Sequence, residues 1–391
     1  MIRWKFLNHL RKDNAIRDYH FWIILLFLIT ILTTSVEATD LIFKADSLPK
    51  GVYQNGDSEL KATQFWRYET GGWVLSSPKV SYGVVYFGSY DNNVYAIDSM
   101  TGIEKWRFKT EDGVYSSPAI FNSTVYIGSN DGNVYAIDEV TGIEKWRFTT
   151  TGNGVESSPA VSNGTVYFGS IGSNVYAIDA TMGTEKWIFA TGSYVLSSPV
   201  VSNGVVYIGS SDNNLYAIDA VTGTEKWRFT TGERIWSSPA VSNDTVYIGS
   251  IDSNVYAINA VTGTEKWQFK TGNYVVSSPV VSNDVVYIGS WDNNLYAIDA
   301  VRGTEKWRFA TGGSVLASPA VSNGVIYIGS WDNNTYAIRV VPSTPIPTPN
   351  YVSIPGFRSI SHLSMFYGMV FLILLIGICY MGWKAVKHRK E

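Results

Sequence analysis

The chain has 391 residues, with 30 basic and 33 acidic side chains and a formal net charge of −3. This balance provides no excess of basic charge, which argues against a nucleic-acid-binding protein. The composition is rich in aromatic residues and glycine, with 14 Trp, 25 Tyr and 35 Gly. Such a composition is typical of all-β proteins with tight turns.

The cysteine and histidine content excludes several kinds of active site. The single cysteine, Cys379, cannot form a disulfide within the chain. The histidines lie near the termini, at His9, His20, His362 and His388. The region from residue 40 to residue 341 therefore has no Cys/His zinc site, no Ser-His-Asp triad and no thiol nucleophile. We predict no catalytic, cofactor-binding or metal-binding residue there.

Residues 1–38 have the pattern of a targeting segment. Basic side chains are followed by the apolar run FWIILLFLITIL. Val36 and Ala38 match the small-residue positions before a cleavage site, so we predict a signal peptide, with an uncleaved signal anchor as the alternative. Residues 39–61 form an N-terminal segment before the repeats.

A thirteen-residue unit such as YIGSWDNNLYAID occurs seven times, spaced by 40 residues with a single 41. Each period contains four short strand candidates, for example SSPVV, VVYIGS, NLYAID and TEKWRF, separated by turn sequences such as Ser-Asn-Gly. Four antiparallel strands per period and no helical stretch predict a seven-bladed β-propeller over residues 62–341. The copies begin at Tyr86, Tyr126, Tyr167, Tyr207, Tyr247, Tyr287 and Tyr327.

The two ends of the repeat region are complementary. The last repeat reaches Pro342 before its fourth strand, whereas an unpaired copy of that strand, ATQFWRYETG, precedes the first repeat. We predict that residues 62–69 complete the seventh blade and close the ring, because an open edge strand would otherwise remain. One tryptophan per blade then occupies the same position: Trp66, Trp106, Trp146, Trp187, Trp227, Trp267 and Trp307.

The C-terminal part has the pattern of a membrane anchor. Spaced prolines in residues 342–364 are typical of an extended stalk. Residues 365–383 are an uncharged run long enough to cross a bilayer as a helix, and residues 384–391 are basic. We predict a single-pass cell-membrane protein with an extracytoplasmic propeller and a cytoplasmic C-terminus. Pro355-Gly356-Phe357 resembles an archaeal C-terminal sorting signal, the alternative to a plain anchor.

The motif Ala96-x-Asp98-x-x-Thr101-Gly102-x-x-x-Trp106 recurs from Ala136 to Trp146 and from Ala217 to Trp227, and with one substitution in other copies. It resembles the tryptophan-docking motif of the pyrroloquinoline-quinone (PQQ) type β-propeller repeats. The resemblance covers residues 62–340 and implies the propeller fold, with the tryptophans in a structural role.

That family includes dehydrogenases that hold PQQ and calcium, and non-enzymatic scaffolds such as the propeller lipoprotein of bacterial outer-membrane assembly. This chain has seven repeats where the dehydrogenases have eight, and it lacks the adjacent cysteine pair that many of them place over the quinone. The resemblance therefore favours a non-enzymatic, membrane-anchored surface protein. A PQQ-dependent oxidoreductase with calcium is the alternative.

Residues that differ between the copies lie in the loop between the second and third strands and in the connection to the next blade. Because strand direction alternates, both connections lie at one end of the ring. Many of these residues are aromatic, as in binding sites; the alternative is that they only cover the sheet ends. The candidate ligand face consists of Trp73, Tyr90, Tyr115, Glu156, Tyr194, Arg234, Trp236, Tyr274, Trp291 and Trp331.

Four Asn-x-Ser/Thr sequences are candidate N-glycosylation sites, at Asn122, Asn163, Asn243 and Asn333. The first three occupy the same turn of different blades, at the end opposite the candidate face. Asparagine as a turn former is the alternative explanation. Turn formation also explains the aspartates of the second-to-third-strand loops, because no copy has the Glu-terminated loop of a dedicated calcium site.

These observations predict a cell-surface propeller scaffold that binds a protein or glycan partner through its aromatic loops. A structural envelope component that assembles without a ligand is a further alternative to the PQQ-dependent oxidoreductase. The sequence does not choose between peptide backbones and sugar rings as partners, since aromatic surfaces suit both.

Overall fold

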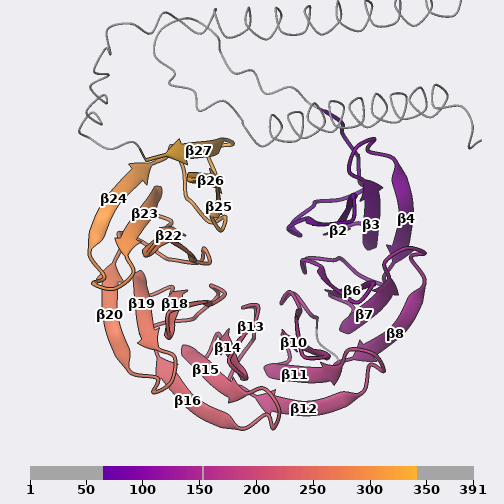
Figure 1. Cartoon of the computed structure of the whole chain (residues 1–391), viewed down its shortest axis with the longest axis horizontal. Coiled ribbons are helices and arrows are strands. Elements are labelled where there is room, and N and C mark those ends of the chain that lie inside the picture. The colour runs from indigo at the N-terminus through magenta and orange to yellow at the C-terminus, as the bar shows by residue number, and fades with distance from the viewer. Residues whose placement is uncertain (1–64, 152–153, 341–391) are drawn as a thin grey trace, which may run out of the picture. The chain divides into compact units, whose positions relative to one another are not determined.

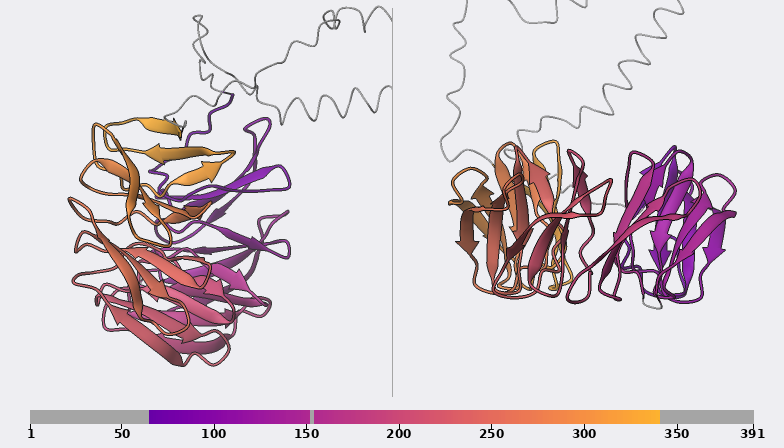
Figure 2. Two further views of the ribbon diagram at one scale, coloured as in Figure 1. Left: turned by 60° about the vertical axis from the view of Figure 1, so that its left-hand side comes forward. Right: turned by 90° about the horizontal axis from the view of Figure 1, so that it is seen from below.

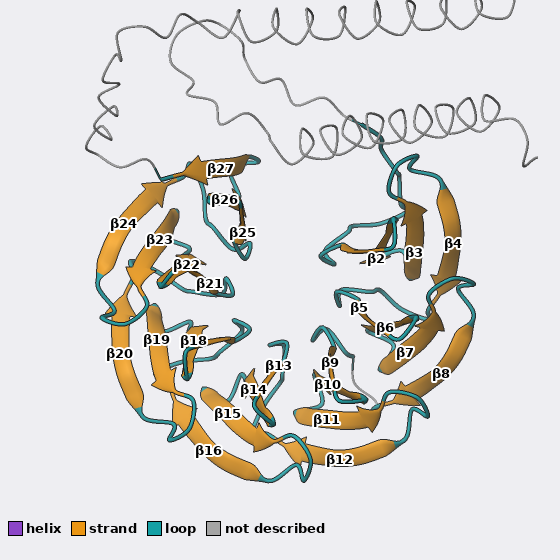
Figure 3. Ribbon diagram, in the orientation of Figure 1, coloured by secondary structure: helices purple, strands orange, loops and turns teal. Residues whose placement is uncertain are grey.

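The computed structural model describes residues 65–151 and 154–340, and its 27 elements are all β-strands (Figures 1 and 3). They form seven antiparallel sheets, each built from strands that are consecutive in sequence. The predicted seven-bladed β-propeller is confirmed. Within these two ranges, no helix could span a membrane. The predicted signal peptide, N-terminal segment 39–61, stalk, transmembrane helix and basic tail lie outside the described residues.

Each of the first six sheets runs from a short inner strand, through two largely buried strands, to an outer strand at the rim (Figure 3). The inner strands are β1 (Lys79–Ser81), β5 (Ala119–Phe121), β9 (Ala160–Ser162), β13 (Val200–Ser202), β17 (Ala240–Ser242), β21 (Val280–Ser282) and β25 (Ala320–Ser322). The second strands are β2 (Val84–Ser89), β6 (Thr124–Gly128), β10 (Thr165–Gly169), β14 (Val205–Gly209), β18 (Thr245–Gly249), β22 (Val285–Gly289) and β26 (Val325–Gly329).

The third strands are β3 (Asn93–Asp98), β7 (Asn133–Asp138), β11 (Asn174–Asp179), β15 (Asn214–Asp219), β19 (Asn254–Asn259), β23 (Asn294–Asp299) and β27 (Thr335–Arg339). The outer strands are β4 (Glu104–Lys109), β8 (Glu144–Thr149), β12 (Glu185–Ala190), β16 (Glu225–Thr230), β20 (Glu265–Lys270) and β24 (Glu305–Ala310).

The core lies between the sheets. Along β3, Val94 and Ala96 pack against the second sheet, while Tyr95 and Ile97 pack on the opposite face. This alternation follows from the two-residue period of a strand, and it explains why the strands are apolar on both faces. Six apolar clusters of this kind join each of the first six sheets to the next.

The recurring tryptophan ties each outer strand to the following sheet. Trp187 of β12, for example, donates from Nε1 to the carbonyl oxygen of Ala220 at 3.1 Å. The glycine of the Thr-Gly turn packs on the same ring: a Cβ at Gly223 would lie 2.6 Å from Trp187 Cγ, and Gly223 has φ +72°. Gly223 also donates from its backbone N to the Asp219 carbonyl oxygen at 2.9 Å, so the Asp–Gly turn of one repeat and the tryptophan of the preceding repeat form one structural unit.

The inner strands are joined by a ladder of serines. In each Ser-Ser-Pro sequence, the second serine donates from its backbone N to the Oγ of the equivalent serine in the next sheet. The ladder contains six hydrogen bonds of 2.9 to 3.0 Å, starting at Ser77–Ser117 and ending at Ser278–Ser318. Small polar side chains next to the axis thus have a specific bonding role.

The aspartate after the second strand is a bridge between blades. Asp212 Oδ2 accepts hydrogen bonds from the backbone N of Gly192, in the preceding connection, at 2.6 Å and from the Tyr216 hydroxyl at 2.8 Å. In the third sheet this position is Gly172. There, among the described residues, the backbone N of Thr151 donates only to the Tyr176 hydroxyl, at 3.5 Å.

Changing Gly172 to Asp should stabilise the propeller by about 1–2 kcal/mol, because it restores two hydrogen bonds and restricts the unfolded chain. The backbone at Gly172 has no positive φ, so a side chain brings no strain of that kind. Thermal unfolding of the full chain measures the gain. Gly172→Ala is the matched control, since it restricts the backbone without supplying a carboxylate; equal gains in the two variants would contradict the bridging role.

The seventh sheet has three strands, in the order β25-β26-β27. Of the predicted closing strand, residues 62–69 (the closing segment), only residues 65–69 are described, and they form no strand. Trp66 and Tyr68 pack on the first sheet, but no described residue pairs with the free edge of β27. Contact with the first sheet closes a short loop, whereas pairing with β27 closes one of about 270 residues, at a higher cost in chain entropy.

Candidate functional site

The propeller has two ends, between which the strands run (Figure 2). We call one end the loop face: it holds the loops between second and third strands and the connections between sheets. The other is the turn face, which holds the turns between first and second strands and between third and fourth strands. This division follows from the antiparallel order within every sheet.

Backbone hydrogen bonds bring the variable residues together on the loop face. The residue two positions after the glycine of each second strand donates from its N to a carbonyl oxygen in the preceding connection, at 2.8 to 3.0 Å. The seven pairs are Tyr90–Trp73, Asn130–Gly113, Ile171–Gly154, Ser211–Tyr194, Ile251–Arg234, Trp291–Tyr274 and Trp331–Ser314. The structure therefore places both sets of variable positions at one end of the propeller.

Six of the ten candidate residues form two aromatic groups. The first group is Trp73, Tyr90 and Tyr115: Trp73 stacks on Tyr90 with ring centroids 5.9 Å apart, and Tyr90 meets Tyr115 edge-on at 5.3 Å.

The second group is Tyr274, Trp291 and Trp331. The ring centroids are 5.4 Å apart for Tyr274 and Trp291 and 5.7 Å apart for Trp291 and Trp331. Nε1 of Trp291 is buried and has no hydrogen-bond partner in the described part of the chain.

The outer members of the two groups face solvent. Trp73 is 72% exposed and Trp331 is 66% exposed, although tryptophan is a residue that proteins usually keep largely buried. Trp291 is enclosed by its neighbours, so covering the sheet ends is a sufficient explanation for its presence. The same explanation does not account for Trp73 or Trp331, whose side chains are mostly exposed.

The remaining candidates do not join these groups. Trp236 donates from Nε1 to Ser211 Oγ at 3.1 Å, while Tyr194 and Arg234 are exposed on neighbouring connections. Glu156 is half-buried, and burial raises the pKa of its carboxyl above the usual value. Neither Glu156 nor Arg234 forms an ion pair with a described residue.

The loop-face aspartates have structural partners. The Tyr336 hydroxyl, which donates to Asp332 Oδ2 at 2.6 Å, lowers the pKa of Asp332 to about 2. Asp91, Asp212, Asp252 and Asp292 each accept the same pair of donors, one tyrosine hydroxyl and one glycine N. The bridge between neighbouring blades was missed in the sequence analysis, although the regular spacing of Asp, Tyr and Thr-Gly was available as a signal.

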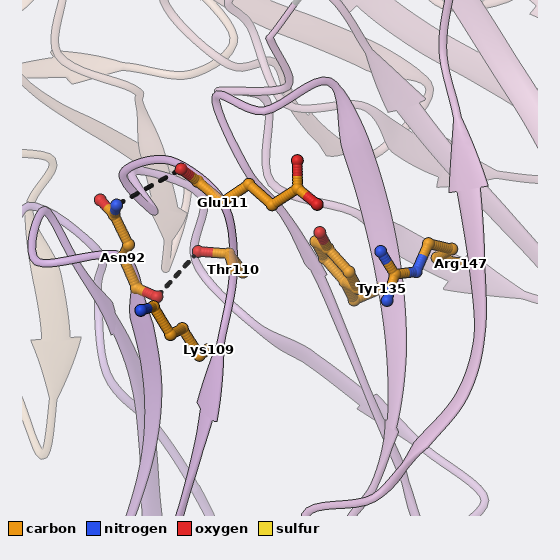
Figure 4. Close-up of a pocket in the computed structure, with 6 residues that line it drawn as sticks. All are labelled: Asn92, Lys109, Thr110, Glu111, Tyr135 and Arg147. Carbon is orange, nitrogen blue, oxygen red and sulfur yellow. Dashed lines mark hydrogen bonds between the residues drawn. The ribbon is translucent and has the colours of Figure 1, made fainter.

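A pocket at the rim, between the first and second sheets, contains none of the candidate residues (Figure 4). It is lined by Asn92, Lys109, Thr110, Glu111, Tyr135 and Arg147. Several of these side chains hold the blade together: Thr110 Oγ1 donates to the Asn92 carbonyl at 2.9 Å, and Arg147 pairs with Glu144 at 2.7 Å while covering the Tyr135 ring. The pocket therefore results from the contacts that hold the outer strands of these two sheets in place.

The three glycosylation candidates of the turn face have a second explanation in the structure. Asn122, Asn163 and Asn243 are exposed and have positive φ, between 46° and 48°. The threonines two residues later are buried, and each accepts a hydrogen bond from a lysine of the outer strand, as in Lys145 Nζ to Thr124 Oγ1 at 2.8 Å. Asn333 lies on the loop face, also with positive φ.

The inner strands do not offer the donors of a quinone–calcium site. Calcium takes six to eight oxygen ligands, usually including carboxylates. The first serine of the inner sequence accepts from a strand backbone, as in Gly128 N to Ser116 Oγ at 3.1 Å, and the second belongs to the ladder. In the described ranges, no three His, Cys, Asp or Glu side chains gather as a metal site. The described residues therefore do not fit PQQ with calcium.

Comparison with known proteins agrees with the repeat analysis. A family model described as "Outer membrane protein assembly factor BamB" matches residues 60–147, 130–236 and 227–341. These segments together include all 27 strands and confirm the resemblance to the PQQ-like repeats. No curated protein sequence matches the chain.

Three solved structures are similar to the propeller. BamB from Moraxella catarrhalis gives a TM-score of 0.62 at 21% identity, with 70% of this chain and 87% of that chain covered. The computationally designed Ika8 protein gives 0.63 at 17% identity, covering 68% and 83%. A europium-containing methanol dehydrogenase gives 0.55 at 13% identity, covering 67% and 72%. At such identities, the similarity shows the fold alone.

Proposed function

Because the chain belongs to the PQQ-like repeat family described as outer membrane protein assembly factor BamB, we propose that it is a non-enzymatic scaffold that holds a protein partner on its loop face. The single observation that carries this proposal is the pair of aromatic groups, Trp73–Tyr90–Tyr115 and Tyr274–Trp291–Trp331, with their outer tryptophans in solvent. Tryptophan and tyrosine are the side chains most enriched at the energetic centres of protein interfaces.

The sequence at both ends supports a position at the cell surface. We propose that residues 365–383 anchor the chain in the cell membrane, that the basic tail stays in the cytoplasm, and that the Pro-rich stalk holds the propeller outside. Both described ends of the propeller lie at the turn face, since Trp66 contacts Ser99 and β27 ends there at Arg339. A stalk leaving from the turn face keeps the loop face free for a partner.

A photo-crosslinking amino acid at position 331 of the full chain in membranes tests the proposal. We expect a covalent adduct with a defined envelope protein, and its loss when Trp291 is changed to Ala. The control carries the crosslinker at Tyr82, an exposed residue in a turn-face hairpin, and should give no such adduct. For the purified pair, Trp331→Ala should weaken binding by about 2 kcal/mol, roughly 30-fold.

Other results would favour other functions. Adducts between copies of this chain at position 331 would indicate a structural envelope component. If a glycan occupies the loop face and no protein adduct forms, the partner is a glycan and not a protein. A quinone absorbance and dye reduction after addition of PQQ and calcium to the full chain would indicate the oxidoreductase; each of these outcomes overturns the scaffold proposal.

A further inference from the structure

Tyr115 and Glu156 occupy the same position on two neighbouring sheets, the second and the third. Each stands two residues before the second serine of its Ser-Ser-Pro sequence. Those two serines are directly bonded, because Ser117 donates from its backbone N to Ser158 Oγ at 2.9 Å. Tyr115 and Glu156 are therefore neighbours on the inner part of the loop face.

Glu156 extends the first aromatic group. Within that group, Trp73 stacks on Tyr90, and Tyr90 meets Tyr115 edge-on. Burial is the main cause of the raised pKa of the Tyr115 hydroxyl, and the charge of Glu156 is a further cause. The carboxylate therefore acts on the last ring of the group. We call the four side chains Trp73, Tyr90, Tyr115 and Glu156 the acidic cage.

The carboxylate of Glu156 has no counter-charge. It is half-buried and forms no ion pair with a residue in the described ranges. Burial alone raises its pKa, without a hydrogen bond or a positive charge that would lower it. Burial of an unpaired carboxylate is unfavourable, because it removes water that stabilises the charge. A ligand that brings a positive charge offsets this cost.

The two aromatic groups differ in this respect. Asp91, beside the first group, already accepts hydrogen bonds from a glycine N and a tyrosine hydroxyl. Beside the second group, the positions equivalent to Glu156 are Val276 and Leu316. The first group, and not the second, therefore combines aromatic rings with a carboxylate that lacks a partner.

The rings of the acidic cage are accessible to a cation. Trp73 is 72% exposed and Tyr90 is 45% exposed. The two ring planes are only 21° from parallel, so Trp73 uses one face for stacking and leaves the other to solvent. The faces of tryptophan and tyrosine rings attract ammonium and guanidinium groups, because the ring quadrupole places negative charge there.

The charge around the acidic cage is negative. The connection that carries Tyr115 contains Glu111 and Asp112 and no basic residue, and the connection that carries Glu156 contains no further charge. Lys109, which ends β4, lines the rim pocket (Figure 4). An excess of negative charge attracts a basic partner and disfavours an acidic one.

We propose that the acidic cage binds an arginine or lysine side chain of the protein partner. The bound cation contacts the aromatic rings and forms an ion pair with Glu156. A neutral sugar ring would also stack on Trp73, but it brings no charge to Glu156, so the unpaired carboxylate favours a basic protein segment. The cation site follows from the cage itself, whereas its assignment to a protein partner rests on the proposed function.

Two peptides that differ by one charge test this proposal on the full chain in detergent micelles. One is a capped glycine–serine peptide with a central arginine, and the other carries citrulline, the neutral analogue of arginine. Saturation-transfer NMR measures both affinities through the peptide signals. We expect the arginine peptide to bind at least about tenfold more tightly, with the strongest transfer at its arginine protons. Equal affinities would overturn the proposal and favour a neutral ligand such as a glycan.

Glu156→Gln shows whether the preference for arginine comes from this carboxylate. The substitution keeps the shape of the side chain and removes its charge, so the two peptides should then bind equally. Glu233→Gln is the matched control, because it removes an exposed carboxylate from another loop-face connection and changes the net charge by the same amount. It should leave the preference intact; loss of the preference in both variants would assign it to the overall charge and contradict the proposal.

The peptide experiment fails independently of the proposed function. A preference for arginine that depends on Glu156, without a protein adduct at position 331, would contradict the proposed function alone. An adduct at position 331, together with equal affinities for the two peptides, would support the scaffold and overturn the cation site.

Discussion

Changing Trp187 to Ala should destabilise the propeller by about 3–5 kcal/mol, the usual cost of deleting a buried aromatic side chain. Trp187 is 7% exposed and packs in the cluster that joins the third sheet to the fourth. Its loss leaves a cavity between the two sheets and removes the hydrogen bond to Ala220 O. A drop of about 10 °C or more in the melting temperature of the full chain is expected.

Trp236→Ala is the matched control for this experiment. It removes the same side chain from the loop face, where the indole is exposed and has one hydrogen bond, to Ser211. Surface substitutions of this kind usually change stability by about 0.5 kcal/mol. Similar losses for the two variants would show that the docking tryptophans do not hold the blades together.

Changing Gly223 to Ala should also lower the stability of the propeller strongly, for two reasons that different variants can separate. The residue has φ +72°, which costs an alanine about 1–2 kcal/mol, and the new Cβ would lie 2.6 Å from Trp187 Cγ. Overpacking of that kind costs about 1–3 kcal/mol more. Gly204→Ala isolates the first term, because Gly204 has φ +73° and no atom within 4 Å of an added Cβ.

A double-mutant cycle then isolates the clash. In the Trp187→Ala background the indole is absent, so Gly223→Ala should cost no more than Gly204→Ala does in the unmodified chain. Chemical unfolding of the four variants gives the coupling free energy between positions 187 and 223. Additive losses would mean that the turn glycine is required only for its backbone conformation.

The repeat made much of the fold predictable, because the information is local and occurs seven times. Alternation within NVYAID and turn residues such as Asn203-Gly204 determine where strands begin and end. Strand order then requires the loop containing Trp291 and the connection containing Tyr274 to share one end. With four antiparallel strands per blade, the loop between the second and third strands and the connection to the next blade must lie at the same end. The common location of the candidate residues could therefore be predicted from the strand order.

Other features depend on distances between blades, which a repeat does not encode. The sequence placed Trp73 and Tyr90 near the boundary between the seventh and first blades, but it did not show that Tyr115 contacts them while Tyr194 and Arg234 stand apart. The structure separates them because ring contacts depend on side-chain directions across neighbouring connections. The role of Asp212 as a bridge likewise required the preceding connection to pass beside its carboxylate.

The sequence by itself determined the number of sheets, their strand order, the docking tryptophans and the end of the propeller that varies, because period and alternation are properties of a single repeat. Only the tertiary structure decided which aromatic side chains meet, which serines bond along the axis, and that Trp66 and Tyr68 pack on the first sheet. These features arise between residues far apart in the chain, whose contact depends on how the sheets stack against one another.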